Sequence, residues 1–246
     1  MRAFAINSSP NMENGNTAVI LSPFLDGMRE AGAEVELFYT KELKIKPCQG
    51  ELHCWFKEPG RCIHKDDMEW VLPKLSQADI FVVATPLYVD GMSGPMKSFF
   101  DRIVPVAQPF IELRDGHCRH PARHQTREDG KLVLVSNCGF WEIDNFDALI
   151  NHMEAICRNL HVEFAGALLR PHGPFLKPMI EMGAPVNDIL EAAKEAGREL
   201  VREGEMSSET LKIVSRELMP QEVYVDMANK RIQELLNEVE RKRASS

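Results

Sequence analysis

Residues 2–17 read RAFAINSSPNMENGNT, and this stretch decides the fold. Its first part, Arg2 to Asn7, is a short apolar run that predicts a buried strand. Turn-forming residues follow from Ser8 to Asn16, and a helix is predicted to begin near Thr17. A strand that passes through a polar turn into a helix is the repeating unit of an α/β fold.

The same alternation continues along the chain. Further strands are predicted at 34–39, 78–85, 131–136 and 162–169, and helices at 17–32, 66–76, 94–104, 144–160 and 187–203. Five strands that alternate with helices predict a doubly wound parallel sheet in three layers, because right-handed crossovers place helices on both faces.

Three segments do not follow this alternation. Residues 40–64 are irregular, 105–130 form an insertion without a clear period, and 171–185 form a loop with four prolines. Two more helices are predicted at 208–217 and 220–243. We therefore divide the chain into a domain at 1–205 and a C-terminal helical extension at 206–246.

Composition and charge narrow the functional classes. The chain of 246 residues has a formal net charge of −8, which disfavours a nucleic-acid partner. No apolar run approaches the roughly 20 residues of a membrane span, and MRAFAINSSP lacks the apolar core of a signal peptide. We expect a cytoplasmic protein whose six cysteines are not a disulfide framework.

Three loops should meet at the ligand-binding edge of the sheet. Ligands of open α/β sheets bind outside the carboxyl ends of the strands, where the strand order reverses. The loops at 8–17, 85–95 and 136–142 follow three predicted strands and occupy that edge.

The first loop suits a phosphate group held by neutral donors. Ser8, Ser9, Asn16 and Thr17 supply hydroxyl and amide groups beside a helix start, and Gly15 permits close backbone approach. The G-x-G-x-x-G fingerprint of dinucleotide sites is absent. An ordinary helix with a capped N-terminus is the alternative, and this loop alone does not decide between the two.

The second and third loops could contact a ring system. PLYVDGMSGPMK (86–97) joins an aromatic side chain to small residues, and Met96 before Lys97 breaks the P-loop pattern, which excludes that nucleotide site. SNCGFWE (136–142) offers an amide, a glycine and two aromatic side chains. A generic turn and ordinary core aromatics are the respective alternatives.

Taken together, the loops resemble the flavodoxin-like NADPH-dependent FMN reductase family, and in particular its iron–sulfur flavoprotein branch. The resemblance covers about residues 1–205 and is most specific in SSPNMENGNT (8–17) and in PLYVDGMSGPMKSFFDR (86–102). It implies a flavodoxin-like sheet of order 2-1-3-4-5 with FMN at its crevice.

The resemblance also implies the residues that would bind the cofactor. It places the FMN phosphate on Ser9, Asn11, Asn16 and Thr17, and the isoalloxazine ring against Pro86, Leu87, Tyr88 and Ser93, with Asn137 and Gly139 on the far side. No catalytic side chain is assigned, because flavin chemistry belongs to the cofactor.

One departure from the iron–sulfur branch concerns its cysteines. That branch carries four closely spaced cysteines that bind a cluster, whereas Glu51 stands here at the position of the second, beside Cys48, Cys54 and Cys62. We therefore expect no iron–sulfur cluster. Zinc on these three thiols with His64 is one alternative. Zinc on His117, Cys118, His120 and His124 is another, although the spacing of that group matches no usual zinc pattern.

The expected function is that of an FMN-dependent NAD(P)H oxidoreductase acting on a small-molecule acceptor. A quinone, a flavin or a nitroaromatic compound would fit, and an electron carrier to a protein partner is the alternative. The insertion and the C-terminal helix, which bears Tyr224, Ala228, Ile232, Leu235 and Val239 on a docking face, predict a homodimer or homotetramer.

Overall fold

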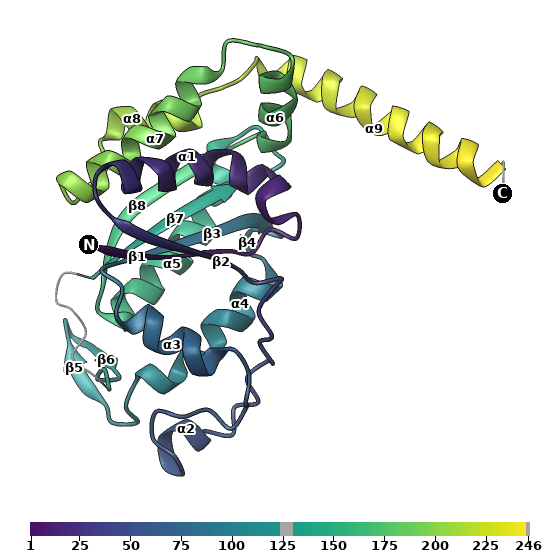
Figure 1. Ribbon diagram of the computed structural model, residues 1–246. Coiled ribbons are helices and arrows are strands. Elements are labelled where there is room, and N and C mark those ends of the chain that lie inside the picture. The colour runs from purple at the N-terminus through teal and green to yellow at the C-terminus, as the bar shows by residue number, and fades with distance from the viewer. Residues whose placement is uncertain (124–129, 245–246) are drawn as a thin grey trace. The chain divides into compact units, whose positions relative to one another are not determined.

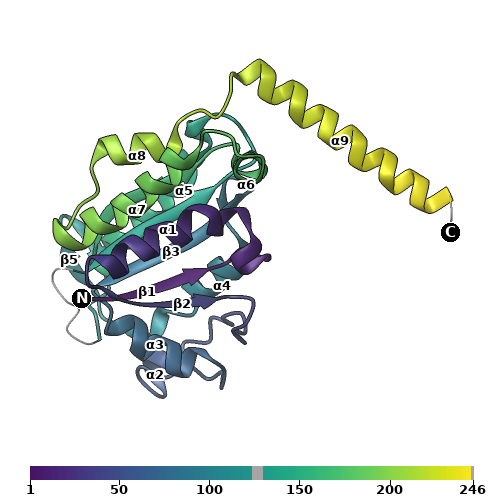
Figure 2. The same ribbon diagram turned by 45° about the horizontal axis from the view of Figure 1, so that its top comes forward.

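The structure is a computed structural model that describes residues 1–123 and 130–244. The chain forms two compact units, Met1–Arg216 and Glu217–Ser246. The first unit is a sheet covered by helices on both faces, and Figures 1 and 2 show its layers.

The central sheet has the predicted strand order. Its five parallel strands run β2-β1-β3-β7-β8, which is the order 2-1-3-4-5 in sequence. Their bounds are β1 Arg2–Asn7, β2 Glu34–Tyr39, β3 Ile80–Tyr88, β7 Lys131–Asn137 and β8 Glu163–Arg170. A short strand, β4 (Gly91–Met92), pairs antiparallel with the end of β3. The doubly wound, flavodoxin-like architecture is therefore confirmed.

Helices cover both faces of the sheet, as right-handed crossovers require. One face carries α1 and α7, with α6 packed against α1 and α8 against α7 and β8. The other carries α3, α4 and α5, whose apolar side chains share one core cluster with the sheet. The bounds are α1 Asn16–Glu30, α3 Met68–Ser76, α4 Gly94–Asp101, α5 Asp147–Leu160, α6 Gly173–Glu181, α7 Asn187–Arg202 and α8 Ser208–Ser215.

Two glycines let α1 and α7 approach each other closely. A Cβ on Gly27 would lie 1.8 Å from the Lys194 carbonyl oxygen, and a Cβ on Gly197 would lie 2.0 Å from that of Phe24. Any larger residue would push the helices apart, so this crossing fixes where α1 begins relative to the sheet.

A buried ion pair anchors the opposite layer. The Arg102 guanidinium donates to both carboxylate oxygens of Asp66, at 2.7 and 3.0 Å, and the two side chains are only 1% and 3% exposed. Arg102 also donates to the Lys46 carbonyl, and the Lys46 amide donates to Asp66. The pair joins the end of α4 to the start of α3. Arg102 therefore has a structural role in joining these two helices.

Several short elements were not predicted. The proline-rich segment 171–185 contains α6, so its prediction as a loop is wrong; Pro174 lies in the first helical turn, where no amide partner is lost. The insertion contains a hairpin of β5 (Glu112–Arg114) and β6 (His117–Arg119). Single-turn helices also occur: α2 His53–Phe56, η1 Met12–Asn14, η2 Val104–Val106 and η3 Ile143–Phe146.

The C-terminal part contains the two predicted helices. Because α8 packs on α7 and β8, it lies within the first compact unit, Met1–Arg216. The 24-residue helix α9 (Gln221–Ala244) makes up most of the second unit. Among the described residues, no helix combines the length and apolar character that a membrane crossing needs.

Candidate functional site

The three predicted loops lie together at the carboxyl edge of the sheet. They follow β1, β3 and β7, and β3 is hydrogen-bonded to both of the others. The helix after β1 packs on one face, whereas α4 after β3 packs on the other. The chain therefore diverges between β1 and β3, which is the topological switch point where such sheets bind ligands.

Side-chain hydrogen bonds tie these loops to one another. Thr17 Oγ1 donates to Asn137 Oδ1 at 2.6 Å across 120 residues of sequence. Ser93 Oγ donates to Ser8 Oγ at 2.7 Å, and all four of these side chains are buried. The bonds hold the first loop against the third and the second loop against the first, so the site is organised by the fold itself.

The first loop presents the start of α1 without a side-chain cap. The cap residue is Gly15, which has no side chain to accept from the first-turn amides, and the first turn has no acidic residue. The helix start is therefore not capped by a serine, threonine or asparagine side chain at that position. Ser9 Oγ closes over Gly15, where an added Cβ would lie 2.2 Å away. This geometry suits an anion at the helix start.

Two lysines from other segments contact the same loop. Lys41 Nζ donates to the Pro10 carbonyl at 2.9 Å, and Lys177 Nζ donates to the Asn14 carbonyl at 3.4 Å. Neither lysine was singled out from the sequence, because they lie after β2 and in α6. They add positive charge to a loop that has no basic residue of its own.

The second loop ends in a strained hairpin turn. Tyr88 pairs with Gly91 across the turn, and both central residues, Val89 and Asp90, have positive φ angles of 49° and 59°. Such angles are costly for a β-branched residue. Val89 is 99% exposed and Tyr88 is 52% exposed, whereas Pro86 is buried. The turn therefore holds an aromatic and an apolar side chain at the rim of the site.

The third loop is braced by the segment after β8. The His172 amide donates to the Phe140 carbonyl, and the Gly173 amide donates to the Cys138 carbonyl. The His172 ring stacks on Trp141 with centroids 6.3 Å apart. Burial, followed by the nearby charge of Arg170, lowers the pKa of His172 to about 4, so the ring is neutral at pH 7. Phe140 remains exposed at the rim.

The residues present fit a flavin mononucleotide. A Cβ added to Gly94 or Gly139 would meet no atom within 4 Å, so open space lies beside both glycines. At the end of β1, Asn7 is fully buried, and its Nδ2 has no hydrogen-bond partner among the described residues. Neutral donors, two lysines and two rim aromatics make up the chemistry expected for a phosphate and a flat ring.

The ten predicted site residues divide by burial. Ser9, Thr17, Pro86, Ser93 and Asn137 are buried, Asn16 and Leu87 are half-buried, and Asn11, Tyr88 and Gly139 are exposed. The structure joins Thr17 to Asn137 directly and connects Ser93 to the first loop through Ser8. Their role in binding a cofactor remains a prediction.

The three cysteines of the segment 40–64 differ in exposure. Cys48 is exposed, Cys62 is half-buried, and Cys54 is buried. Burial, and then the neighbouring Cys62 and Glu51, raise the pKa of the Cys54 thiol. Within 1–123 and 130–244, no group of three His, Cys, Asp or Glu side chains is arranged to hold a metal. His124 of the second zinc alternative lies outside the described residues.

A cavity of about 600 Å³ lies at the opposite edge of the sheet. Its lining includes Asp79, Lys131 and Val162, which stand at the amino ends of β3, β7 and β8. It is therefore separate from the switch point, where the loops converge.

Comparison with known proteins supports the resemblance. Residues 1–121 match the family of NADPH-dependent FMN reductases. An iron–sulfur flavoprotein of Methanocaldococcus jannaschii is 38% identical over 104 residues, which are 42% of this chain and 50% of that protein. The chain spans about half the length of the curated relatives that it matches.

Solved structures show the same fold. An FMN-dependent NADH-azoreductase of Bacillus anthracis, in complex with FMN, superposes with a TM-score of 0.61 at 14% identity, covering 82% of this chain and 99% of the other. An NAD(P)H:quinone oxidoreductase of Methanothermobacter marburgensis superposes with a TM-score of 0.57 at 17% identity, covering 81% and 96%. At these identities the likeness concerns the architecture alone.

Proposed function

We propose, starting from the match of residues 1–121 to the NADPH-dependent FMN reductase family, that this chain is an FMN-dependent NAD(P)H oxidoreductase. The observation that carries the proposal is the joining of three loops at the switch point, through the Thr17–Asn137 and Ser93–Ser8 hydrogen bonds. A ligand at this edge meets all three loops at once.

The phosphate end of FMN is assigned to the first loop. The first-turn amides of α1 and the hydroxyls of Ser9 and Thr17 would donate to the phosphate oxygens, and Lys41 and Lys177, which contact this loop, would lower the electrostatic cost of binding a dianion. Thr17 would turn its hydroxyl from Asn137 to the phosphate or share it between the two.

The ring end is assigned to the second and third loops. In this proposal Pro86, Leu87, Tyr88 and Ser93 would line one side of the ring, and Asn137 and Gly139 would line the other. Bound FMN would accept a hydride from NAD(P)H and pass two electrons to an acceptor. The backbone of the third loop, braced by His172 and Gly173, is placed to stabilise negative charge at the ring edge.

The acceptor is proposed to be a small molecule. Quinones, free flavins and nitroaromatic compounds share the flat, electron-poor chemistry that can stack beside Tyr88 and Phe140 at the exposed rim. We also propose a cytoplasmic homodimer or homotetramer without a nucleic-acid or membrane partner, in keeping with the net charge of −8.

Steady-state turnover tests this proposal. Purified protein loaded with FMN should oxidise NADH or NADPH when a small quinone or a nitroaromatic compound is supplied, and the loss of reduced-nicotinamide absorbance follows the reaction. Protein without FMN is the control. Loaded protein that oxidises neither nucleotide with any of these acceptors would contradict the reductase proposal.

A second candidate is an electron carrier to a protein partner. It is favoured by the relatives that are named iron–sulfur flavoproteins and by the open rim, where Val89 and Phe140 are exposed. A carrier would bind FMN yet show negligible turnover with NAD(P)H and small acceptors, while a chemically reduced sample would pass electrons to a redox protein. The same assay therefore separates the two candidates.

A further inference from the structure

Helix α9 carries an apolar stripe that no described part of the chain covers. Ile232 is 54% exposed, and Val225, Leu235 and Val239 are similarly exposed. Within residues 221–243, whose exposure is described, Tyr224 and Ala228 are half-buried and the others are exposed. The helix lies in a compact unit of its own, Glu217–Ser246. An isolated helix gains little stability in water without packing of an apolar face. We therefore expect the apolar stripe of α9 to pack against a partner.

The spacing of the stripe identifies the kind of partner. Val225, Ala228, Ile232, Leu235 and Val239 follow one another at intervals of three, four, three and four residues. This is the heptad repeat of a coiled coil, in which positions a and d form the seam. The docking face predicted from sequence began at Tyr224. The heptad spacing instead makes Val225 the first residue of the seam.

The residue types favour a parallel pair of identical helices. The a positions are Val225, Ile232 and Val239, all β-branched, and the d positions of the stripe are Ala228 and Leu235. Lys242, at the next d position, ends the apolar seam. β-Branched residues at a with leucine at d favour two parallel strands. In such a pair Glu238 at position g faces Arg243 at position e of the partner helix, so the flanking charges attract.

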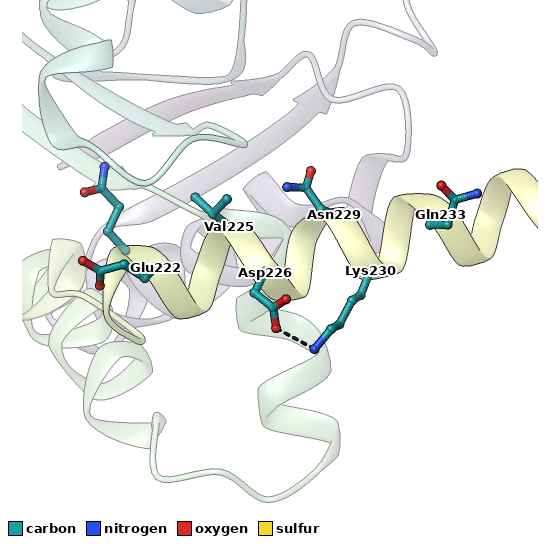
Figure 3. A pocket seen from close by; sticks show the side chains of 7 residues that line it. Glu222, Val225, Asp226, Asn229, Lys230 and Gln233 are labelled. Carbon is teal, nitrogen blue, oxygen red and sulfur yellow. Dashed lines mark hydrogen bonds and ion pairs between the residues drawn. The ribbon is translucent and has the colours of Figure 1, made fainter.

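Outside the stripe the helix surface is mostly charged or polar, with three further exposed apolar residues, Val223, Met227 and Leu236. Asp226 and Lys230 form an ion pair at 2.6 Å, and Arg231 pairs with Glu234 at 3.1 Å. Figure 3 shows the first of these pairs beside Val225, with Asn229 and Gln233 farther along the helix. The shallow hollow drawn there is lined by residues of α9 alone, so it is a helix face and not a closed ligand pocket.

We propose that α9 joins two copies of this chain through a parallel, two-stranded coiled coil whose seam is Val225, Ala228, Ile232, Leu235 and Val239. A second copy supplies an identical stripe, and a two-fold axis along the seam brings like positions together. The inference stands independently of flavin binding, and it names the surface that holds the assembly together.

Sedimentation of the full chain tests the proposal. Wild-type protein should sediment at about twice the 27.9 kDa chain mass. The double variant Ile232→Asp, Leu235→Asp should dissociate, with a dissociation constant raised by ~100-fold or more, because it places four carboxylates in the seam. The matched control, Val223→Asp with Met227→Asp, changes exposed apolar residues away from the stripe and should remain dimeric.

Thermal melting of both double variants should leave the transition of the sheet unit in place, because α9 is a separate compact unit. A monomeric wild type at every concentration, or a Ile232→Asp, Leu235→Asp variant as dimeric as its control, would overturn the proposal.

Oxidative cross-linking tests the parallel register. In a chain with Cys48→Ser and Cys118→Ser, which removes the exposed thiols, Leu235→Cys should form an inter-chain disulfide because d positions of a parallel pair face each other. Met227→Cys should not. Failure of Leu235→Cys to cross-link in a chain that remains dimeric would contradict the parallel arrangement.

Discussion

Thr17 is the residue on which the three-loop site depends most directly. Its hydroxyl is buried and donates to Asn137, so one side chain links the start of α1 to the end of β7. A threonine here can serve both the third loop and a bound phosphate, because a hydroxyl rotates between acceptors.

Replacing Thr17 by valine should therefore weaken FMN binding. Valine keeps the shape and removes the hydroxyl, and loss of a hydrogen bond to a charged group costs about 1.5–3 kcal/mol, or roughly ten- to hundredfold in affinity. Fluorescence titration of FMN measures this. Ser76→Ala, an exposed hydroxyl in α3, is the control that should bind as wild type. Equal affinity of the Thr17 variant would place the phosphate elsewhere.

Lys177 should strengthen FMN binding through its positive charge and not through a specific hydrogen bond to the cofactor. Lys177→Ala removes a cation beside the Asn14 carbonyl, so FMN affinity should fall several-fold at low salt, and the difference should shrink as salt rises. Titrations at about 0.01 M and 1 M salt measure the effect, with Lys212→Ala in α8 as the control. A difference that does not change with salt would argue against an electrostatic role.

Asp66 should govern part of the stability of the sheet unit. Asp66→Asn leaves the buried Arg102 charge without its carboxylate, which costs about 3–5 kcal/mol for a buried pair. Asp101→Asn, which loosens an exposed pair with Lys97, should cost less than about 1 kcal/mol. Chemical denaturation at pH 7 measures the free energy of unfolding of both variants. Equal decreases would mean that the buried pair stabilises the fold no more than the exposed pair does.

The contribution of Asp66 should also depend on pH. Burial alone would raise the pKa of its carboxyl, but hydrogen bonds from Arg102 and the Lys46 amide outweigh it and bring the pKa below its usual value. A lowered folded-state pKa gives stability that is present above the unfolded pKa of about 3.9 and is lost as pH falls through the folded value. The gap between wild type and Asp66→Asn should therefore narrow below about pH 4; a constant gap would contradict this.

At the level of single residues, the sequence predicted the three loops of the candidate site but not the two lysines beside the first loop. Serine, asparagine and threonine beside a strand end point to an anion because of their own chemistry. Lys41 and Lys177 reach the loop from separate segments, so only the three-dimensional structure brings them there. A lysine directly after β2 was the one available signal, since β2 ends at the same edge of the sheet.

At the scale of elements, the crossing of α1 and α7 links stability to the site. Gly197→Ala gains about 1 kcal/mol of helix propensity, yet its Cβ would lie 2.0 Å from a backbone oxygen that cannot rotate away. The clash should dominate, with a net loss of about 1–3 kcal/mol and weaker FMN binding, because α1 must shift.

Thermal melting and FMN titration of this variant check both effects. Glu191→Ala, at an exposed position of α7, is the matched control and should change neither. Gly27→Ala should behave like Gly197→Ala. If Gly197→Ala matches its control, the close approach of the two helices is not required.

The long elements were predictable from sequence because each buries one regular face. Every parallel strand of the sheet was expected within a few residues, since buried β-branched and aromatic runs such as Ile80–Val83 have few alternatives. Helix α6 was missed because prolines normally interrupt a helix, whereas Pro174 lies in its first turn and Pro178 is tolerated within it. The β5–β6 hairpin has strands of three residues, too short for any period.

At the scale of the whole molecule, the account predicts a flavoprotein without an iron–sulfur cluster. A [4Fe–4S] cluster takes four thiolates. The segment supplies three thiols, Cys48, Cys54 and Cys62, and the carboxylate of Glu51, at the position of the branch's second cysteine, suits soft iron–sulfur chemistry poorly. Iron and acid-labile sulfide analysis after anaerobic purification should find neither. About four of each per chain would contradict the prediction and favour the electron carrier.

The central claim is that the carboxyl edge of the sheet binds FMN through its phosphate. The most direct test is a fluorescence titration of flavin-free protein with FMN and, in parallel, with riboflavin, which lacks the phosphate. The account predicts saturation at one FMN per chain and binding of riboflavin at least about tenfold weaker, because the α1 amides, Thr17 and the two lysines act on the phosphate alone. Equal affinities for the two flavins, or no binding of FMN, would contradict it.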